Sequence, residues 1–429
     1  MDSNTLPVAV IGAGPVGLAA AAHLLERGLE PVIFEAGSSA GAAVDQWRHI
    51  RLFSPWRFNI DAAALRLLEG TGWVPPRPTA VPFGGELVDN YLAPLAALPS
   101  IASRLVAGAR VSAVTRQGMD KAHTQGRDSA AFVVRVEHAD GQTRDHTVAA
   151  VIDASGTWST RNPLGDSGLP ARGEMAAGHA ISPPLPDVNG RDRDAFAGRR
   201  VLVVGAGHSA ANTLINLAEL AKSSPDTRVI WAVRGSSEAK AYGGGDADGL
   251  PARGQLGARL RRLVEAGRIE LHTGFGIAAL QGCAAGTSVE ARDGRTVAAD
   301  IIVPCTGFRP DLEMLREIRL DLDPAVEAPS ELGPLIDPEF HSCGTVAPHG
   351  AKVLAHPDKN FFIVGMKSYG RAPTFLLATG YEQVRSVAAA LAGDHTAADT
   401  VHLELPETGV CSPGARTRCD APLPEPSTC

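Results

Sequence analysis

The stretch Gly12-Ala13-Gly14-Pro15-Val16-Gly17 decides the fold of the first part of the chain. It follows the apolar, β-branched run Val8-Ala9-Val10-Ile11 and begins a helical pattern that extends to about Gly28. A strand, a glycine turn and a helix in this order form a dinucleotide-binding fingerprint. Its first glycine makes the tight turn, its second lets the backbone approach a pyrophosphate, and its third packs the helix against the strand. The N-terminus of the helix then stabilises the negative charge.

A second fingerprint, Gly205-Ala206-Gly207-His208-Ser209-Ala210, lies about 190 residues further along the chain. It also follows an apolar run, Val201-Leu202-Val203-Val204, and begins a helical pattern. One glycine-rich turn alone is weak evidence, because such turns are common. Two turns in this strand-to-helix context predict two dinucleotide sites and therefore electron transfer between two bound dinucleotides.

The residue that ends the second strand of each unit predicts which dinucleotide binds there. The run Pro31-Val32-Ile33-Phe34 ends at Glu35, at the spacing where an acid binds a ribose hydroxyl. A solvated surface glutamate is the alternative, and this acid does not separate NAD from FAD. The run Val229-Ile230-Trp231-Ala232-Val233 ends at Arg234, a cation that suits the 2′-phosphate of NADPH. A solvated surface cation is the alternative for Arg234. Arg253 is expected in the loop that follows, where it could add positive charge. The first unit is then expected to bind FAD.

The composition is typical of a globular protein with two or three domains. The chain has 429 residues, 44% of them hydrophobic and 20% charged. Its net charge of −7 gives no reason to expect nucleic acid or an anionic membrane as a partner. No apolar run approaches the roughly 18 residues of a membrane span. The first residues lack a basic signal-peptide region, and the six cysteines, none of them in the first 282 residues, do not resemble a disulfide framework, so we expect a reducing, cytoplasmic compartment.

Two turns of small residues mark the points where the chain is expected to cross between the two units. The run Val148–Asp153 is typical of a strand and leads to Ser155-Gly156. The run Asp300–Pro304 is also typical of a strand and leads to Thr306-Gly307. Small residues at strand ends let the backbone pass close to a cofactor or to a crossing segment. One turn precedes the second fingerprint and one follows it, which predicts that the second unit is inserted into the first.

The C-terminal part is expected to complete the first unit with the run Asn360–Gly365 and a helix from about Thr374 to Leu391. The polar residues Met119–Ser129 are expected to be poorly structured. The sequence thus predicts an α/β fold with two Rossmann-like dinucleotide-binding domains. The expected domains are an FAD-binding domain at 1–160 and 316–402, an NADPH-binding domain at 161–315, and a mobile tail that contains cysteines at 403–429.

On these motifs the chain resembles the two-dinucleotide-domain flavoproteins, which include flavin-containing monooxygenases, Baeyer–Villiger monooxygenases and thioredoxin-reductase-like enzymes. The resemblance covers residues 7 to about 392. Within that group, four strings are similar to flavin-binding monooxygenases encoded beside arsenic resistance genes: Arg51-Leu52-Phe53-Ser54-Pro55-Trp56, His341-Ser342-Cys343-Gly344-Thr345, Lys367-Ser368-Tyr369-Gly370-Arg371-Ala372-Pro373 and Leu405-Pro406-Glu407-Thr408-Gly409-Val410-Cys411. The resemblance implies FAD and NADPH as cofactors, Gly365 beside the ribityl chain, and trivalent arsenic as a candidate substrate.

The chain departs from these relatives in three respects. It contains no Cys-x-x-Cys, which disfavours disulfide reduction through an internal dithiol. Relatives carry Gly-Asp where the C-terminal segment meets the flavin, whereas Gly365 is followed here by Met366-Lys367. The monooxygenase signature Phe-x-Gly…His ahead of the second fingerprint lacks its Phe, and His179 is either its remnant or a loop histidine.

Catalytic candidates come from the segment after the second strand of the first unit, where relatives place flavin-facing residues. These candidates are Arg51, Ser54 and Trp56. Trp47 is expected to contact the cofactor, and core packing is the alternative for both tryptophans. Lys367 could stabilise negative charge on reduced flavin, or it could be exposed.

The cysteines fall into two sets. Cys283 and Cys305 lie in or beside expected strands and are predicted to be small buried hydrophobes. Thiolates are natural ligands of soft ions, which makes Cys343, Cys411 and Cys419 candidates for capturing a thiophilic ion. The tail cysteines match no zinc spacing, so no metal site is predicted, and incidental cysteines are the alternative.

Three functions follow from these patterns. The first is an NADPH-dependent flavin monooxygenase that oxygenates a soft nucleophile, such as trivalent arsenic, with O2 as its second substrate. The second is an NADPH reductase that uses FAD to reduce a partner protein, a quinone or an external disulfide. The third is a redox-sensing flavoprotein whose thiols bind the ligand. A homodimer is left open in each case.

Overall fold

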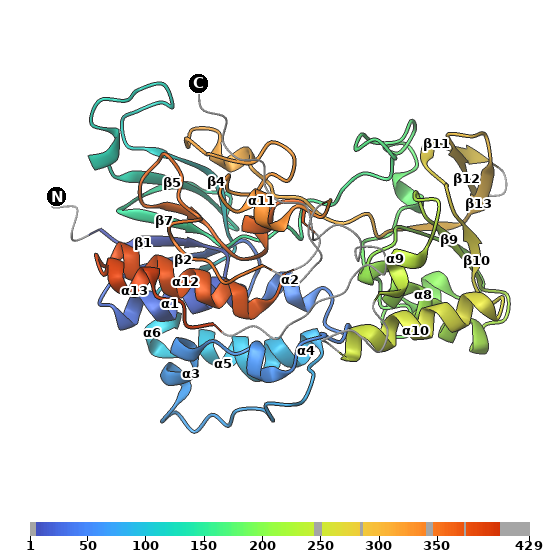
Figure 1. Cartoon of the computed structure of the whole chain (residues 1–429), viewed down its shortest axis with the longest axis horizontal. Coiled ribbons are helices and arrows are strands. Elements are labelled where there is room, and N and C mark those ends of the chain that lie inside the picture. The colour runs from blue at the N-terminus through green and yellow to red at the C-terminus, as the bar shows by residue number, and fades with distance from the viewer. Residues whose placement is uncertain (1–5, 244–250, 284–285, 340–345, 373–374, 404–429) are drawn as a thin grey trace, which may run out of the picture.

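The computed structural model describes residues 6–243, 251–283, 286–339, 346–372 and 375–403. This part of the chain forms two lobes (Figure 1). Each lobe contains one parallel sheet and one antiparallel sheet. The predicted α/β class with two Rossmann-like sheets is therefore confirmed.

The parallel sheet of the first lobe is assembled from distant parts of the chain. Among the described residues its order is β15-β7-β1-β2-β3, and every neighbour is parallel. Val10 lies opposite Ile33 on one side and Ile152 on the other. Its strands are β1 (Val8–Ile11), β2 (Pro31–Glu35), β3 (Leu105–Ala107), β7 (Ala150–Asp153) and β15 (Phe361–Ile363). Since β15 pairs with β7, the predicted return of the chain to the first unit is confirmed.

The parallel sheet of the second lobe comes from one continuous stretch. Its order in the described part of the chain is β10-β9-β8-β14. Its strands are β8 (Arg200–Val204), β9 (Arg228–Ala232), β10 (Glu270–His272) and β14 (Ile301–Pro304). Buried Val, Leu and Ile residues fill β8 and β14, as expected for strands that are covered on both faces.

Antiparallel strands and helices complete the lobes. The strands of the two antiparallel sheets are β4 (Ala109–Arg116), β5 (Phe132–His138) and β6 (Thr143–Val148) in the first lobe, and β11 (Ile277–Cys283), β12 (Gly286–Ala291) and β13 (Thr296–Ala299) in the second. The longer helices are α1 (Pro15–Glu26), α8 (His208–Ser223), α10 (Pro251–Glu265) and α12 (Leu377–Leu391). Shorter helices include α2 (Ala42–Asp45), α3 (Ala62–Leu68), α4 (Gly84–Leu87), α5 (Ala93–Ala96), α6 (Pro99–Ala102), α7 (Arg193–Phe196), α9 (Ala239–Tyr242), α11 (Gly333–Ile336) and α13 (His395–Asp399). One-turn 3-10 and π segments include Trp56–Phe58, Val88–Leu92, Arg127–Ser129, Gly178–Ala180, Glu313–Leu315 and Gly365–Tyr369.

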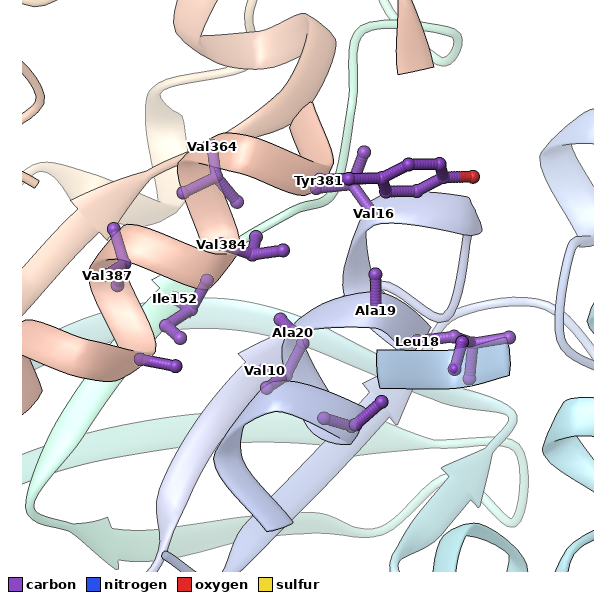
Figure 2. Close-up of a cluster of buried hydrophobic side chains, with 14 of the residues drawn as sticks. Val10, Val16, Leu18, Ala19, Ala20, Ile152, Val364, Tyr381, Val384 and Val387 are labelled. Carbon is purple, nitrogen blue, oxygen red and sulfur yellow. The ribbon is translucent and has the colours of Figure 1, made fainter. Parts of the chain in front are cut away.

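The core of the first lobe joins α1 and α12 to the parallel sheet (Figure 2). Helix α1 presents small residues such as Ala19 and Ala20, which let α12 approach closely. Val384 and Val387 lie one helical turn apart on the facing side of α12 and are fully buried. Because α12 follows β15, this packing fixes the C-terminal segment against the first glycine turn.

Four local expectations are wrong. Val148–Asp153 is not one strand, because β6 ends at Val148 in the antiparallel sheet and β7 begins at Ala150 in the parallel sheet. Helix α12 begins at Leu377, three residues later than expected. Arg253 lies buried in α10 and not in a loop.

The fourth wrong expectation concerns Met119–Ser129, because Arg127 in this polar stretch is almost completely buried. Its guanidinium donates from Nε to Asp358 Oδ1 at 2.7 Å and from Nη2 to Oδ2 at 2.8 Å. Arg116 donates to the same carboxylate at 3.3 Å and lies over the ring of Phe132. This buried charge cluster fixes the loop against the residues that precede β15.

Candidate functional site

The first glycine turn has the conformation that a dinucleotide site needs. Gly12 has φ +96°, and a Cβ there would lie 2.9 Å from the carbonyl oxygen of Ala154. A Cβ at Gly17 would overlap the carbonyl oxygen of Gly12, so glycine is required where α1 meets the turn. A Cβ at Gly14 would meet no atom within 4 Å. The turn is therefore closed on its inner side and open at Gly14, with Pro15 and Val16 beginning the helix.

Glu35 lies beside this turn at the carboxyl end of β2. Its Oε2 accepts a hydrogen bond from the backbone N–H of Ala13 at 2.7 Å, and its Oε1 accepts one from Gly37 at 2.7 Å. The side chain is thus fixed against the fingerprint and is not a freely solvated surface glutamate. This is the place where an acid can accept hydrogen bonds from an adenosine ribose.

The second glycine turn repeats the geometry of the first. Gly205 has φ +129°, and a Cβ there would overlap the carbonyl oxygen of Cys305. A Cβ at Gly207 would meet no atom within 4 Å, so this turn is also open on its outer side. Ser209 is half-buried and Ala210 is fully buried at the start of α8. Neither α1 nor α8 has a side-chain cap, which leaves their first N–H groups suited to an anion.

Strand register distinguishes the ribose corners of the two units. Ile11 lies opposite Phe34, whereas Val204 lies opposite Ala232. The residue equivalent to Glu35 is therefore Val233, which is buried, and Arg234 follows one position later. The second unit thus carries no acid at this position and presents an exposed cation beside it.

Arg234 is positioned by the segment that enters the second lobe. Its Nη1 donates to the carbonyl oxygen of Asp166 at 2.9 Å. The Asp166 carboxylate accepts from Arg292 at 2.5 Å and 2.8 Å, and these hydrogen bonds lower the pKa of Asp166. Since the carboxylate is engaged by Arg292, the Arg234 guanidinium keeps donors for an anionic ligand.

The two crossing segments lie side by side. The Asn162 N–H donates to the Gly307 carbonyl at 2.9 Å, and the Thr306 hydroxyl donates to the Asn162 carbonyl at 2.7 Å. The Arg309 N–H donates to the Thr160 carbonyl at 3.0 Å. The turn at Thr306-Gly307 is thus joined to the segment that follows Ser155-Gly156. Gly156 has φ +70° and open space where a side chain would project.

The turn after β15 brings Gly365 against the first helix. Gly365 has φ +68°, and a Cβ there would lie 3.3 Å from Val16. Its N–H donates to Gln383 Oε1 at 2.7 Å, and Gln383 Nε2 contacts both His349 Nε2 and Ser368 Oγ at 2.9 Å. Burial lowers the pKa of His349, so its neutral ring accepts from Gln383. Gln383 and His349 were not predictable from the sequence, because both lie far from the fingerprints along the chain.

Lys367 is buried and not exposed. Its Nζ donates to Asp153 Oδ2 at 2.7 Å and to Ser155 Oγ at 3.1 Å. Asp153 ends β7, where it lies opposite both Ile11 and Ile363. Asp153 was not among the predicted site residues, although its position at the end of an apolar run shortly before Ser155-Gly156 was a usable signal.

The segment with the other catalytic candidates belongs to the first lobe and contacts the second unit at Phe53. Phe53 contacts His208 at the start of α8, with ring centroids 4.9 Å apart. Ser54 is buried and its hydroxyl donates to Asn59 Oδ1 at 2.7 Å. Trp56 is buried in the first-lobe core, and Trp47 packs partly buried against the same core.

Arg51 is the exposed member of these candidates. Its Nε donates to the Val81 carbonyl at 3.3 Å, and its guanidinium lies 5.9 Å from the centre of the Phe83 ring. Arg51 therefore lies on the surface of the first lobe, whereas the two tryptophans belong to its core.

Cys305, the cysteine whose side chain the structure describes, is suited to packing. Cys305 is buried beside Thr213, and burial raises the pKa of its thiol to about 12. Cys283 ends β11. The candidates Cys343, Cys411 and Cys419 lie outside the described residues. No group of three or more His, Cys, Asp or Glu side chains in the described ranges could hold a metal ion.

These observations define a class: a protein with two dinucleotide-binding units, each with a glycine turn that only glycine can form and an open face at the helix N-terminus. The chain belongs to the pyridine nucleotide-disulphide oxidoreductase family, whose model matches residues 6–328. Membership implies FAD and NAD(P)H as cofactors, and the residues of both turns fit such ligands. The protein is a flavin-dependent pyridine nucleotide oxidoreductase.

Solved structures share this fold at low sequence identity. Bacillithiol disulfide reductase from Bacillus cereus has a TM-score of 0.65 and 20% identity, with 90% of this chain and 99% of that chain covered. A flavin-containing monooxygenase from Stenotrophomonas maltophilia has a TM-score of 0.56 and 20% identity, with 90% and 98% covered. Thioredoxin reductase from T. acidophilum has a TM-score of 0.56 and 16% identity, with 91% and 99% covered.

The solved relatives include both reductases and a monooxygenase, so they support the fold alone. No curated protein sequence matches the chain. Within the described ranges, no helix combines the length and the apolar character that crossing a bilayer requires.

Proposed function

We propose that the protein is an NADPH-dependent flavin monooxygenase that oxygenates a small soft nucleophile. One oxygen atom of O2 is added to the substrate, and the other leaves as water with two electrons from NADPH and two protons. Bound FAD supplies the electron transfer and the activation of O2. The chain itself holds the two dinucleotides, orients them and excludes water.

The observation that carries this proposal is the lack of a Cys-x-x-Cys motif of the kind that passes electrons from a flavin to a disulfide. The sequence has no Cys-x-x-Cys. Cys305 is buried with a raised pKa, which makes it a poor nucleophile at neutral pH. The resemblance of the strings at Arg51–Trp56 and Lys367–Pro373 to arsenic-associated monooxygenases supports the same conclusion.

NADPH is favoured over NADH by the ribose corner of the second unit. An acid at the position of Val233 would repel a 2′-phosphate, and none is present there. Arg234 is exposed and fixed by the Asp166 carbonyl, so it can donate charge-assisted hydrogen bonds to that phosphate. FAD is assigned to the first unit, where Glu35 faces the turn.

Among the catalytic candidates, Arg51 is proposed to contact the substrate or the flavin. Ser54 and Trp56 are proposed to line the site and to exclude water from it, because both are buried and the Ser54 hydroxyl already donates to Asn59. Removing water from such a site strengthens the remaining polar interactions.

The experiment that tests this function measures NADPH oxidation and O2 uptake with and without a soft nucleophile. A monooxygenase consumes O2 and NADPH in equal amounts when its substrate is present. Turnover without O2, sustained by a quinone or an external disulfide, would instead establish the reductase function. Tight ligand binding with negligible turnover under both conditions would favour the redox-sensing function.

Trivalent arsenic is the proposed soft nucleophile, with Cys343, Cys411 and Cys419 as capturing thiols. A chain truncated after Pro406 then loses affinity for methylarsenite, because a tethered thiol raises the local ligand concentration. Full rate and affinity in the truncated chain would show that the tail cysteines are incidental. No stimulation of the intact enzyme by arsenite or methylarsenite would remove arsenic as the substrate and leave the cofactor assignment in place.

A further inference from the structure

The Asp153–Lys367 ion pair lies at the edge of the first sheet where a dinucleotide binds. Both side chains are completely inaccessible to solvent, and their charged atoms are 2.7 Å apart. Asp153 ends β7, and Lys367 follows β15, so both lie at the carboxyl ends of neighbouring parallel strands. In open parallel sheets, ligands bind outside this edge.

Ser155 connects this buried pair to the exposed edge. It is exposed, whereas Asp153 and Lys367 are not. Its hydroxyl donates to Asp153 Oδ1 at 2.6 Å and accepts from Lys367 Nζ. A serine oxygen has two lone pairs, so one acceptor position remains for a ligand. Ser155 also packs its backbone against the fingerprint, because a Cβ on Gly12 would lie 3.1 Å from the Ser155 Cα.

A second buried charge cluster lies at the opposite end of β15. Asp358, which accepts from Arg116 and Arg127, precedes the first residue of this strand by three positions. It is as deeply buried as Asp153. The amino end of a parallel strand faces away from the dinucleotide edge. Asp358 therefore provides a matched control for Asp153: a buried carboxylate on the same sheet but at the edge without a fingerprint.

We propose that Asp153 and Lys367 set the reduction potential of FAD bound at this edge, with Ser155 connecting the pair to the cofactor. Reduction places additional negative charge on the flavin. A buried cation nearby favours that charge and a buried carboxylate opposes it, because charges act strongly where water is excluded. The two residues thus shift the reduction potential of the flavin in opposite directions. This inference rests on the proposed assignment of FAD to the first unit.

The test compares the FAD potential of purified Lys367→Gln and Asp153→Asn variants with that of the wild type by spectroelectrochemical titration. Lys367→Gln is expected to lower the potential, and Asp153→Asn is expected to raise it. The double variant, which leaves no uncompensated charge, is expected to return towards the wild-type value. Lys367→Arg keeps the charge and is expected to stay close to the wild type. Asp358→Asn, the matched control, is expected to leave the potential unchanged.

Ser155→Ala supplies a readout that does not depend on a buried substitution. Because Ser155 is exposed, this variant is expected to fold, and its FAD dissociation constant is expected to rise about threefold to tenfold through the lost hydrogen bond. Unchanged FAD affinity and potential in Ser155→Ala would overturn the proposal. Shifts of the same sign in Lys367→Gln and Asp153→Asn, or an equal shift in Asp358→Asn, would also overturn it. A wild-type protein that binds no FAD would instead refute the proposed function.

Discussion

The two parallel sheets share one strand–turn–helix plan but are held together by different kinds of ion pair. In the first lobe, Asp153–Lys367 and Asp358–Arg116 are almost completely buried. In the second lobe, Arg200 and Asp300 are 30% and 26% exposed, and Arg292 is 69% exposed beside Asp166. The first sheet joins residues more than 200 positions apart, whereas β8 to β14 form one continuous stretch.

This difference shows how an inserted domain changes the contacts that the interrupted sheet needs for its stability. Because the insertion interrupts the first sheet, β15 has to pair with it from the far end of the chain. Closing such a long loop costs chain entropy, which long-range contacts have to offset. Buried charges with fixed partners favour one register over others. The second sheet closes over a shorter stretch, and its Arg200–Asp300 pair is partly exposed, so this pair contributes less to stability than a fully buried one.

The largest expected effect comes from breaking a buried cluster of the first lobe. Asp358→Asn leaves Arg116 and Arg127 buried without their carboxylate, and we expect a loss of about 3–5 kcal/mol in the free energy of unfolding. Urea unfolding followed by circular dichroism measures this loss. Arg292→Ala in the second lobe is the control, and its loss is expected to be much smaller because Arg292 is largely exposed. Equal losses in the two variants would contradict the comparison between the lobes.

The second prediction concerns the ribose corner of the first unit. Glu35→Ala removes the acceptor of the Ala13 and Gly37 N–H groups and, with FAD bound, the acceptor of the ribose. We expect FAD binding to weaken by about 1.5–3 kcal/mol, measured by titration of the apoprotein. Isolation of the wild-type protein with stoichiometric FMN would contradict the assignment, because FMN has no adenosine.

The third prediction concerns the ribose corner of the second unit. If NADPH binds as proposed, Arg234→Ala removes a charge-assisted hydrogen bond to its 2′-phosphate, so the KM for NADPH should rise about tenfold while that for NADH stays almost unchanged. Steady-state kinetics with both coenzymes measures the change. Arg295→Ala is the control, since Arg295 pairs with Asp293 and donates to the carbonyl groups of Thr273 and Gly274 in the segment after β10. An equal loss with both coenzymes would show that Arg234 has a structural role.

The smallest expected effect is the reactivity of Cys305. Its pKa is raised to about 12, so the thiolate fraction at about pH 8 is very small. We expect no alkylation of Cys305 by iodoacetamide in the native protein, as measured by peptide mass spectrometry, and rapid alkylation after unfolding. Modification of native Cys305 at the rate of a free thiol would contradict this prediction and would make Cys305 a candidate for thiol–disulfide chemistry.

The sequence predicted the local units because a glycine fingerprint is a local signal. Gly12 and Gly205 each come directly after their own short apolar strand. In the structure both have the positive φ angle that such a turn needs. Glu35 was also predictable, since it ends the next strand. Strand boundaries were less predictable: Val148–Asp153 looked continuous, yet it is divided between two sheets.

Residues that act through distant partners were not predictable. From the sequence alone, Lys367 could have been exposed. Only the structure shows that it is buried and paired with Asp153. Gln383 lies in a helix that is buried on most of its sides, and nothing in its sequence neighbours indicates that it fixes Gly365. Arg127 lies in a polar stretch that looked unstructured, because its partner Asp358 is 231 residues away.

The sequence by itself determined the two dinucleotide units, their order along the chain and the opposite character of Glu35 and Arg234. These features depend on backbone conformation and residue type within a few tens of residues. Only the tertiary structure decided which charges are buried, which carbonyl positions Arg234, and which side chains meet at the edge beside Gly12. Burial and pairing depend on how β15 and α12 return to the first sheet. Contacts between residues more than 200 positions apart leave no periodic pattern in a single sequence.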